Sequence, residues 1–238
     1  MPHTNHLGQP IGQPLPGWTA RPRPPRTPIE GRFCRLEILD PQKHAADLFA
    51  ANSLDKDGRN WTYLAYGPFD RLEDYRAWAE KMAAGDDPLF HTIIDLATGK
   101  AVGVATLMRI DTAAGVIETG HLNYSPLLQR KPAATEAMFL LMRRVFDELG
   151  YRRYEWKCDS LNAPSRAAAE RLGFIYEGRF RQATVYKGRN RDTDWFSIID
   201  SEWPALKRAY EAWLDPANFD ATGKQRQSLR ALIAKERG

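Results

Sequence analysis

Three consecutive segments near the middle of the sequence alternate apolar and polar residues and are joined by short turn sequences. The segments are 89–95, 101–110 and 116–124, and the turns between them contain Gly99 and Gly115. Alternation with a period of two is typical of strands that bury one face, and a short glycine-containing turn joins antiparallel neighbours. The sequence therefore predicts a three-stranded antiparallel meander.

Beyond Pro126 the period lengthens to that of an α-helix. Apolar side chains recur every three or four residues over 134–149, and Gly150 is a typical helix-ending residue. Because helices and strands follow one another in the rest of the chain, we expect one α/β (α+β) domain with a mixed, mostly antiparallel central sheet flanked by helices. The other expected elements are a strand over 33–38, helices beginning near 41 and 70, a strand over 154–158, a short helix after 162, strands over 174–185 and 195–200, and a last helix over 203–214.

The composition of the 238 residues fits a protein with a substantial core, because 43% are hydrophobic and 27% are charged. No apolar run approaches the roughly 18 residues that a membrane-spanning helix needs, and the N-terminus lacks the pattern of a secretory signal. Cys34 and Cys158 make no disulfide framework, and the five histidines show no metal-ligand spacing. We therefore expect a soluble, cytoplasmic protein with neither a metal ion nor a membrane partner.

The two ends of the chain differ from its middle. Eight of the 16 prolines lie within residues 1–28, so we expect a Pro-rich N-terminal arm over 1–30. A domain over 31–201 follows, and a C-terminal helix and basic tail occupy 202–238. The basic tail accounts for much of the formal net charge of +4. Such a tail is typical of a solvated end, and it leaves nucleic-acid or ribosome binding as an alternative role.

The segment from Gln129 to Thr135 enters the predicted helix with two cationic side chains followed by small residues. The start of a helix presents free backbone N–H groups and the positive end of the helix dipole, and together these bind phosphate. The same pattern also occurs at ordinary helix starts with solvated charges. Further residues are needed to decide between the two interpretations.

A second group of residues lies one strand downstream. It comprises Asn162-Ala-Pro-Ser165, Arg171-Leu-Gly-Phe174 and Glu177-Gly178. Together with the 129–135 loop, it resembles the motifs of the GNAT superfamily of CoA-dependent N-acetyltransferases, and is most similar to the RimJ/RimL-like group. The resemblance implies the GNAT fold, acetyl-CoA as co-substrate, and direct transfer of acetyl to a primary amine in a ternary complex. The expected acceptor is a protein or peptide N-terminal α-amine, with a small free amine as the alternative.

The resemblance also implies roles for individual residues. Ser165 stands where the group places a hydroxyl near the CoA sulfur, and Asn162 would contact the cofactor arm or hold its loop. The strand 118–124 would line the pantetheine arm and supply the N–H that polarises the thioester carbonyl. The expected cofactor-binding residues are Leu128, Gln129, Arg130, Lys131, Pro132, Ala133, Ala134, Thr135, Asn162 and Ser165.

Two residues depart from the family pattern. Pro132 replaces the central glycine of the loop; proline suits the first position of a helix but removes one N–H donor. Thr184 stands where one branch of the group carries a glutamate as general base, a role that threonine cannot take. An α-amine has a pKa near 7.7–8.0 and is partly neutral at pH 7, whereas a lysine-like amine, with a pKa of about 10.4, is charged. The missing base therefore favours an N-terminal acceptor.

Glu118 is the candidate replacement base, acting directly or through water, because carboxylates on this strand serve as bases in other family members. His121 lies three residues further on and would face the opposite side of a regular strand, whereas a bulge would change this. The expected substrate-side residues are Trp61, Tyr63, His121 and Arg181, although the two aromatic residues also fit a core role and the arginine a solvated hairpin.

The departures at Pro132 and Thr184 are also compatible with a function of another class, an acyl-CoA-binding module that does not catalyse transfer. Such a module would bind CoA tightly and release no thiol in the presence of any amine. The sequence leaves open the identity of the acceptor, the length of the acyl group and the oligomeric state, including a homodimer.

Overall fold

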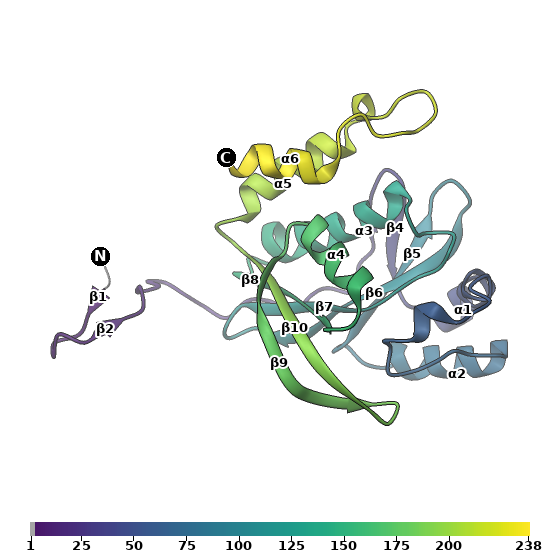
Figure 1. The fold of residues 1–238 in the computed structure, drawn as a ribbon, viewed down its shortest axis with the longest axis horizontal. Coiled ribbons are helices and arrows are strands. Elements are labelled where there is room, and N and C mark those ends of the chain that lie inside the picture. Colours follow the sequence, from purple (N-terminus) through teal and green to yellow (C-terminus); the bar gives the residue numbers. More distant parts are fainter. Residues whose placement is uncertain (1–2) are drawn as a thin grey trace.

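The computed structural model describes residues 3–238, and a mixed eight-stranded sheet is the central element of this part of the chain (Figure 1). The strand order is β3-β4-β5-β6-β7-β8-β10-β9, and every neighbouring pair is antiparallel except β7 and β8. The predicted meander, β5-β6-β7, and the predicted mostly antiparallel sheet are confirmed. The strands are β3 (Ile29–Glu30), β4 (Cys34–Ile38), β5 (Leu89–Asp95), β6 (Lys100–Asp111), β7 (Val116–Tyr124), β8 (Arg153–Asp159), β9 (Ile175–Tyr186) and β10 (Arg189–Ile199).

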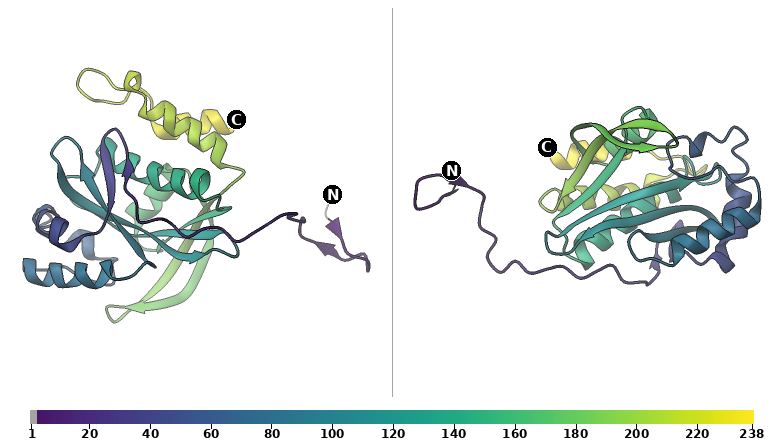
Figure 2. Two further views of the ribbon diagram at one scale, coloured as in Figure 1. Left: turned by 180° about the vertical axis from the view of Figure 1, so that it is seen from behind. Right: turned by 90° about the horizontal axis from the view of Figure 1, so that it is seen from below.

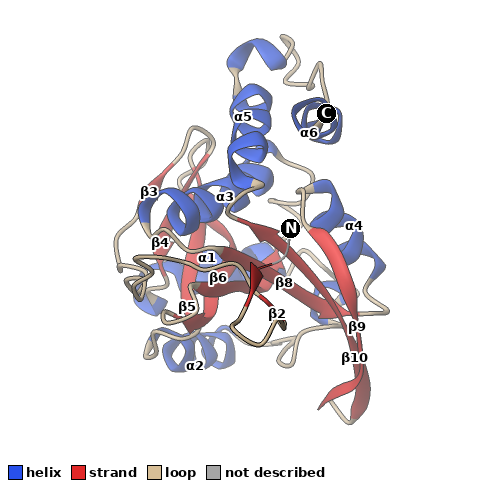
Figure 3. Cartoon of the chain, turned by 90° about the vertical axis from the view of Figure 1, so that its left-hand side faces the viewer, coloured by secondary structure: helices blue, strands red, loops and turns tan. Residues whose placement is uncertain are grey.

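Helices cover both faces of the sheet (Figure 3). α1 and α2 pack on one face, over a core that includes Phe90 and Val104, and we call this the α1–α2 face. α3, α5 and α6 lie over the opposite face, whose core includes Ile117 and Phe196. No helix within residues 3–238 is both long and apolar enough to cross a membrane. The helices are α1 (Pro41–Asn52), α2 (Leu72–Ala83), α3 (Pro132–Arg143), α4 (Ala163–Arg171), α5 (Trp203–Leu214) and α6 (Leu229–Arg237), with short turns η1 (Arg59–Trp61), η2 (Arg144–Glu148) and η3 (Pro216–Asn218).

Two helix starts follow directly from local sequence. The side chain of Asp40 accepts hydrogen bonds from the backbone N–H groups of Gln42 and Lys43. Pro41 occupies the first turn of α1, where backbone N–H groups have no acceptor within the helix, so the N–H that proline lacks costs no helical hydrogen bond. Asn162 caps α4 in the same manner. These caps fix where α1 and α4 begin, and α4 begins beside the site described below.

The two ends of the described chain are organised differently. The chain begins with a small hairpin, β1 (His3–Thr4) and β2 (Pro10–Ile11), that stands away from the domain (Figure 2). The segment after this hairpin then runs extended across the domain. At the other end, the expectation of a solvated tail is corrected for residues 229–237, which form α6 against α5. α6 is held there because three apolar side chains at helical spacing are buried, namely Leu229, Leu232 and Ile233.

Candidate active site

The site forms where β7 and β8 separate. These parallel strands are paired over Val116–Thr119 and Arg153–Trp156. Beyond that, β7 continues to Tyr124 and β8 to Asp159, and no pairing joins them in the described chain. Strands that separate in this way present backbone N–H and C=O groups that an extended ligand can bind.

A β-bulge in β7 turns His121 toward the α1–α2 face. His121 and Leu122 together stand opposite Ala105 of β6, and His121 has a φ of 48°. Its ring stacks on Tyr66 with 5.6 Å between the centroids, and its Nδ1 lies 3.2 Å from the Tyr66 hydroxyl oxygen. The bulge also interrupts the regular β6–β7 pairing at His121 and Leu122.

Burial, and to a lesser degree the positive charge of Arg109, lower the pKa of His121 to about 4. The imidazole is therefore neutral at physiological pH. Arg109 also binds Glu118, so His121 and Glu118 share one face of the sheet. The sequence placed them on opposite faces only if β7 were regular, and the bulge, which adds one residue to β7, brings both side chains to one face.

Glu118 is buried between two cations. Arg109 Nη1 lies 2.7 Å from each carboxylate oxygen, Lys157 Nζ lies 2.8 Å from Oε2, and the side chain is only 3% exposed. Lys157 also pairs with Glu155 and lies over the ring of Trp195. Both carboxylate oxygens of Glu118 are therefore engaged in ion pairs at a buried position. These contacts suit an electrostatic anchor better than a free general base.

The start of α3 has the features of an anion site. Pro132 is the first residue of the helix, as expected, and the preceding Arg130 has a φ of 61°. The backbone N–H groups of Arg130 and Ala133 have no hydrogen-bond acceptor within residues 3–238. The side chains of Arg130 and Lys131 are exposed and form no ion pair with the rest of the described chain. Free N–H groups, the helix dipole and two cations favour a phosphate-bearing ligand.

Other residues of this loop hold it in place. Gln129 Nε2 donates to the carbonyl oxygen of Tyr124 at 2.8 Å and to Asn60 Oδ1 at 2.9 Å, which ties the loop to β7 and to η1. Arg171 Nη1 donates to the Thr135 hydroxyl at 3.2 Å and adds a third cation near the start of α3. The buried members of the loop and first helical turn are Leu128, Ala133, Ala134 and Thr135.

The first turn of α4 places Ser165 beside β8. Trp156 Nε1 donates a hydrogen bond to Ser165 Oγ at 3.0 Å. Asn162 Oδ1 accepts the backbone N–H of Ser165 at 3.1 Å, so Asn162 holds the loop, one of its two expected roles. Burial raises the pKa of the nearby Cys158 thiol, which leaves that thiol a poor nucleophile.

The expected substrate-side residues occupy different places. Trp61 is buried in the core of the α1–α2 face, whereas Arg181 is exposed on β9 and makes no salt bridge within residues 3–238. The Tyr63 hydroxyl donates to the carbonyl oxygen of Leu161 at 3.0 Å, joining the segment after η1 to the loop after β8. Tyr63 and His121 therefore border the opening, while Trp61 packs behind it and Arg181 lies apart.

The β9–β10 hairpin, which extends beyond the rest of the sheet (Figure 1), reaches the same segment. Lys187 Nζ donates to the carbonyl oxygen of Trp61, and Arg189 Nη2 donates to that of Thr62, each at 2.9 Å. The hairpin and the η1 segment together border the opening between β7 and β8.

Sequence reasoning missed Asn123. This residue of β7 pairs with Val104 on the α1–α2 face and is 2% exposed, yet neither atom of its side-chain amide has a hydrogen-bond partner in the described chain. A buried amide without partners is costly, which makes Asn123 a candidate for contacting a ligand. The sequence carried no signal for it, because a polar residue in an alternating strand is expected to face solvent.

Comparisons with known proteins agree with this geometry. The profile of the family described as "Acetyltransferase (GNAT) domain" matches residues 35–175. A solved GCN5-related N-acetyltransferase from Brucella melitensis is 54% identical, covers 92% of this chain and 100% of its own, and has a TM-score of 0.91. The ribosomal N-acetyltransferase candidate YdaF of Bacillus subtilis is 29% identical over 109 residues, which are 46% of this chain and 59% of YdaF. The fold is also similar to that of the microcin C7 self-immunity acetyltransferase MccE, solved with acetyl-CoA and AMP (22% identity, 71% of this chain, 93% of MccE, TM-score 0.62).

Proposed function

The chain belongs to the GNAT acetyltransferase family and to its RimJ/RimL-like group, and on this basis we propose that it acetylates the N-terminal α-amine of a protein or peptide. It is an acetyl-CoA-dependent N-acetyltransferase. Two side chains on the α1–α2 face, His121 and Glu118, support this class of acceptor.

The described residues fit acetyl-CoA, which supplies the acetyl group as a thioester for attack by an amine nitrogen. Arg130, Lys131 and the free N–H groups at the start of α3 would hold its pyrophosphate. Backbone N–H groups at the β7 bulge would stabilise negative charge on the carbonyl oxygen, an effect typically worth about 3–4 kcal/mol per donor. The Ser165 hydroxyl would donate a hydrogen bond to the departing sulfur.

We assign His121 as the proton acceptor, and Glu118 as the anchor of Arg109 and Lys157 in place of the base role that the sequence suggested. An imidazole with a pKa of about 4 is a weak base. It suits an α-amine, whose pKa of about 7.7–8.0 leaves part of it neutral already, and cannot deprotonate a lysine-like ammonium with a pKa of about 10.4. Both oxygens of the Glu118 carboxylate are bound by Arg109 and Lys157, so this carboxylate is not free to take a proton from a charged amine. That arrangement is the observation that carries the α-amine proposal.

Free-thiol release from acetyl-CoA tests this function. The panel contains short peptides with different N-terminal residues, the same peptides with a blocked N-terminus, and small amines that include amino acids and polyamines. We expect turnover with free peptides and none with blocked ones. Turnover with small amines alone would instead establish the alternative acceptor class. If no member of the panel causes thiol release while CoA still binds, the assignment of catalysis is contradicted.

A further inference from the structure

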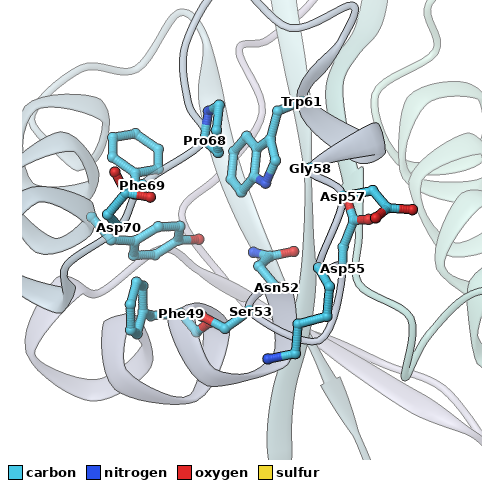
Figure 4. Close-up of a pocket in the computed structure, with 12 residues that line it drawn as sticks. Phe49, Asn52, Ser53, Asp55, Asp57, Gly58, Trp61, Pro68, Phe69 and Asp70 are labelled. Atoms are coloured by element: carbon cyan, nitrogen blue, oxygen red, sulfur yellow. The ribbon is translucent and has the colours of Figure 1, made fainter.

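A cavity of about 320 Å³ lies between the C-terminal end of α1, the segment around η1 and the start of α2 (Figure 4). Among the residues assigned above to the acetyl-transfer site, Trp61 is the one that also lines this cavity within residues 3–238. The cavity has the volume of a site for a small molecule or a single side chain. Nothing in the proposed reaction uses it.

Aromatic rings from four separate parts of the chain form one wall of this cavity. Trp61 and Phe69 lie 5.5 Å apart between centroids, Phe69 and Tyr75 lie 5.4 Å apart, and Phe49 and Tyr75 lie 6.2 Å apart. The negative electrostatic potential over the face of such rings attracts an organic cation. A continuous aromatic wall therefore favours a positively charged group, provided that the rest of the lining supplies hydrogen-bond acceptors.

Asn52 supplies such an acceptor. It is 6% exposed, lines the cavity and stands at its centre in Figure 4. Its Oδ1 is buried and has no hydrogen-bond partner anywhere in residues 3–238. An unpaired amide oxygen at a buried position is satisfied by an N–H or O–H donor of a ligand.

The rim of the cavity is acidic. Asp55, Asp57 and Asp70 line it, with Lys56 as the opposing charge, although the whole chain carries a net charge of +4. Asp57 pairs with Arg59 at 2.7 Å, so that carboxylate is shared with a neighbour. Local negative charge on a basic protein favours a cationic ligand over an anionic one.

We propose that this cavity binds an organic cation with N–H donors, either a guanidinium or ammonium group at the end of a basic side chain or the same group on a free small molecule. The aromatic wall would hold the charge, Asn52 Oδ1 would accept an N–H, and Asp57 and Asp70 would complement the charge at the rim. The site is distinct from the acetyl-transfer centre. The two share the segment 58–69, because Trp61 lines the cavity and Tyr66 stacks on His121.

Calorimetric titration of the full-length protein with ethylguanidinium, which cannot accept an acetyl group as an alkylamine does, tests the proposal. N-ethylurea serves as the neutral probe of nearly the same shape. We expect saturable binding of ethylguanidinium at least about tenfold tighter than that of N-ethylurea. The double substitution Asp57→Asn and Asp70→Asn should weaken binding about fivefold, because it removes two rim charges. The matched control, Glu73→Gln and Asp74→Asn, changes two exposed acids outside the cavity and should leave the affinity unchanged.

A second arm distinguishes the two sources of the cation. The blocked peptide acetyl-Gly-Arg-Gly-amide is compared with its citrulline counterpart. Binding of the arginine peptide at least as tight as that of ethylguanidinium would assign the site to a side chain of a protein, and exclusion of the peptide would assign it to a free cation. Equal affinity for ethylguanidinium and N-ethylurea, no saturable binding, or unchanged affinity in the Asp57/Asp70 variant would overturn the proposal. Both aspartates are exposed, so the Asp57/Asp70 variant is expected to fold.

Discussion

The indole N–H of Trp156 donates a hydrogen bond to the hydroxyl oxygen of Ser165 at 3.0 Å. Trp156 is the last residue of β8 that pairs with β7, and Ser165 lies in the first turn of α4. A hydroxyl that accepts a hydrogen bond in this way keeps its own proton available to donate. The pair therefore presents a polarised O–H at the point where the two strands begin to separate.

Replacement of Ser165 by alanine tests that role. We expect kcat to fall about tenfold while KM for acetyl-CoA changes by less than about twofold, because the lost hydrogen bond is made to the sulfur as it departs. Steady-state kinetics of thiol release measures both constants. Ser201→Ala, at an exposed position far from the site in sequence, is the control. An unchanged kcat in Ser165→Ala would remove the hydroxyl from the mechanism.

The pH dependence of kcat/KM should be set by the pKa of the acceptor amine and not by the pKa of a group on the enzyme. A protonated amine has no free lone pair, so the rate should fall as pH falls through the amine's own pKa, about 7.7–8.0 for an α-amine. The pKa of His121, lowered to about 4 by burial, keeps the imidazole neutral above about pH 5 and adds no step near its ordinary value. Two peptides whose amines differ in pKa should therefore give two different midpoints. One midpoint near 6.5 for both peptides would contradict this assignment.

Substitution of His121 itself gives the companion measurement. His121→Asn should lower kcat about tenfold. The pH midpoint of kcat/KM should stay at the pKa of the acceptor amine. A shifted midpoint would mean that His121 titrates during turnover.

The cations at the start of α3 are predicted to bind the cofactor and to take no part in chemistry. The double substitution Arg130→Ala and Lys131→Ala should raise KM for acetyl-CoA about tenfold with little change in kcat, and the KM should become less sensitive to salt. The control is the exposed pair Lys224→Ala and Arg226→Ala. A KM equal to that of the native protein would show that the phosphates bind elsewhere.

Glu136 joins α3 to the first strands of the sheet. Its buried carboxylate accepts the backbone N–H groups of Arg32, Phe33 and Cys34 at 2.7, 2.6 and 2.8 Å. Glu136→Gln turns one acceptor oxygen into an NH₂ group that faces these donors, so we expect a loss of about 2–3 kcal/mol in the free energy of unfolding. Urea unfolding measures it. Glu148→Gln, which removes the ion pair of this half-exposed carboxylate with Arg144 in η2, should cost less than about 1 kcal/mol; equal losses in the two variants would contradict this expectation.

Local patterns were sufficient to predict most of the sheet. β7 begins and ends at the predicted residues, Val116 and Tyr124, because alternation and flanking turn residues fix a strand without reference to its neighbours. α3 begins at Pro132 for a similar reason, since proline is suited to the first helical position. The cofactor loop was accessible to sequence reasoning because its residues are contiguous.

The acceptor side could not be predicted in the same way. The bulge at His121 depends on how β7 registers against Ala105 of β6, and no local residue encodes that register. The unpartnered state of Asn123 depends on which side chains cover it. The ion pair of Glu118 with Lys157 likewise joins two strands, β7 and β8, that are separated by a helix in the sequence.

A peptide that carries both a free N-terminus and an internal lysine distinguishes transfer to an α-amine from transfer to a side-chain amine. The peptide is incubated with acetyl-CoA at pH 7, and fragmentation by mass spectrometry locates the added acetyl group. We expect acetyl on the N-terminal nitrogen, because His121 is too weak a base for the lysine ammonium. Acetyl mainly on the lysine side chain would contradict the assignment of an α-amine acceptor.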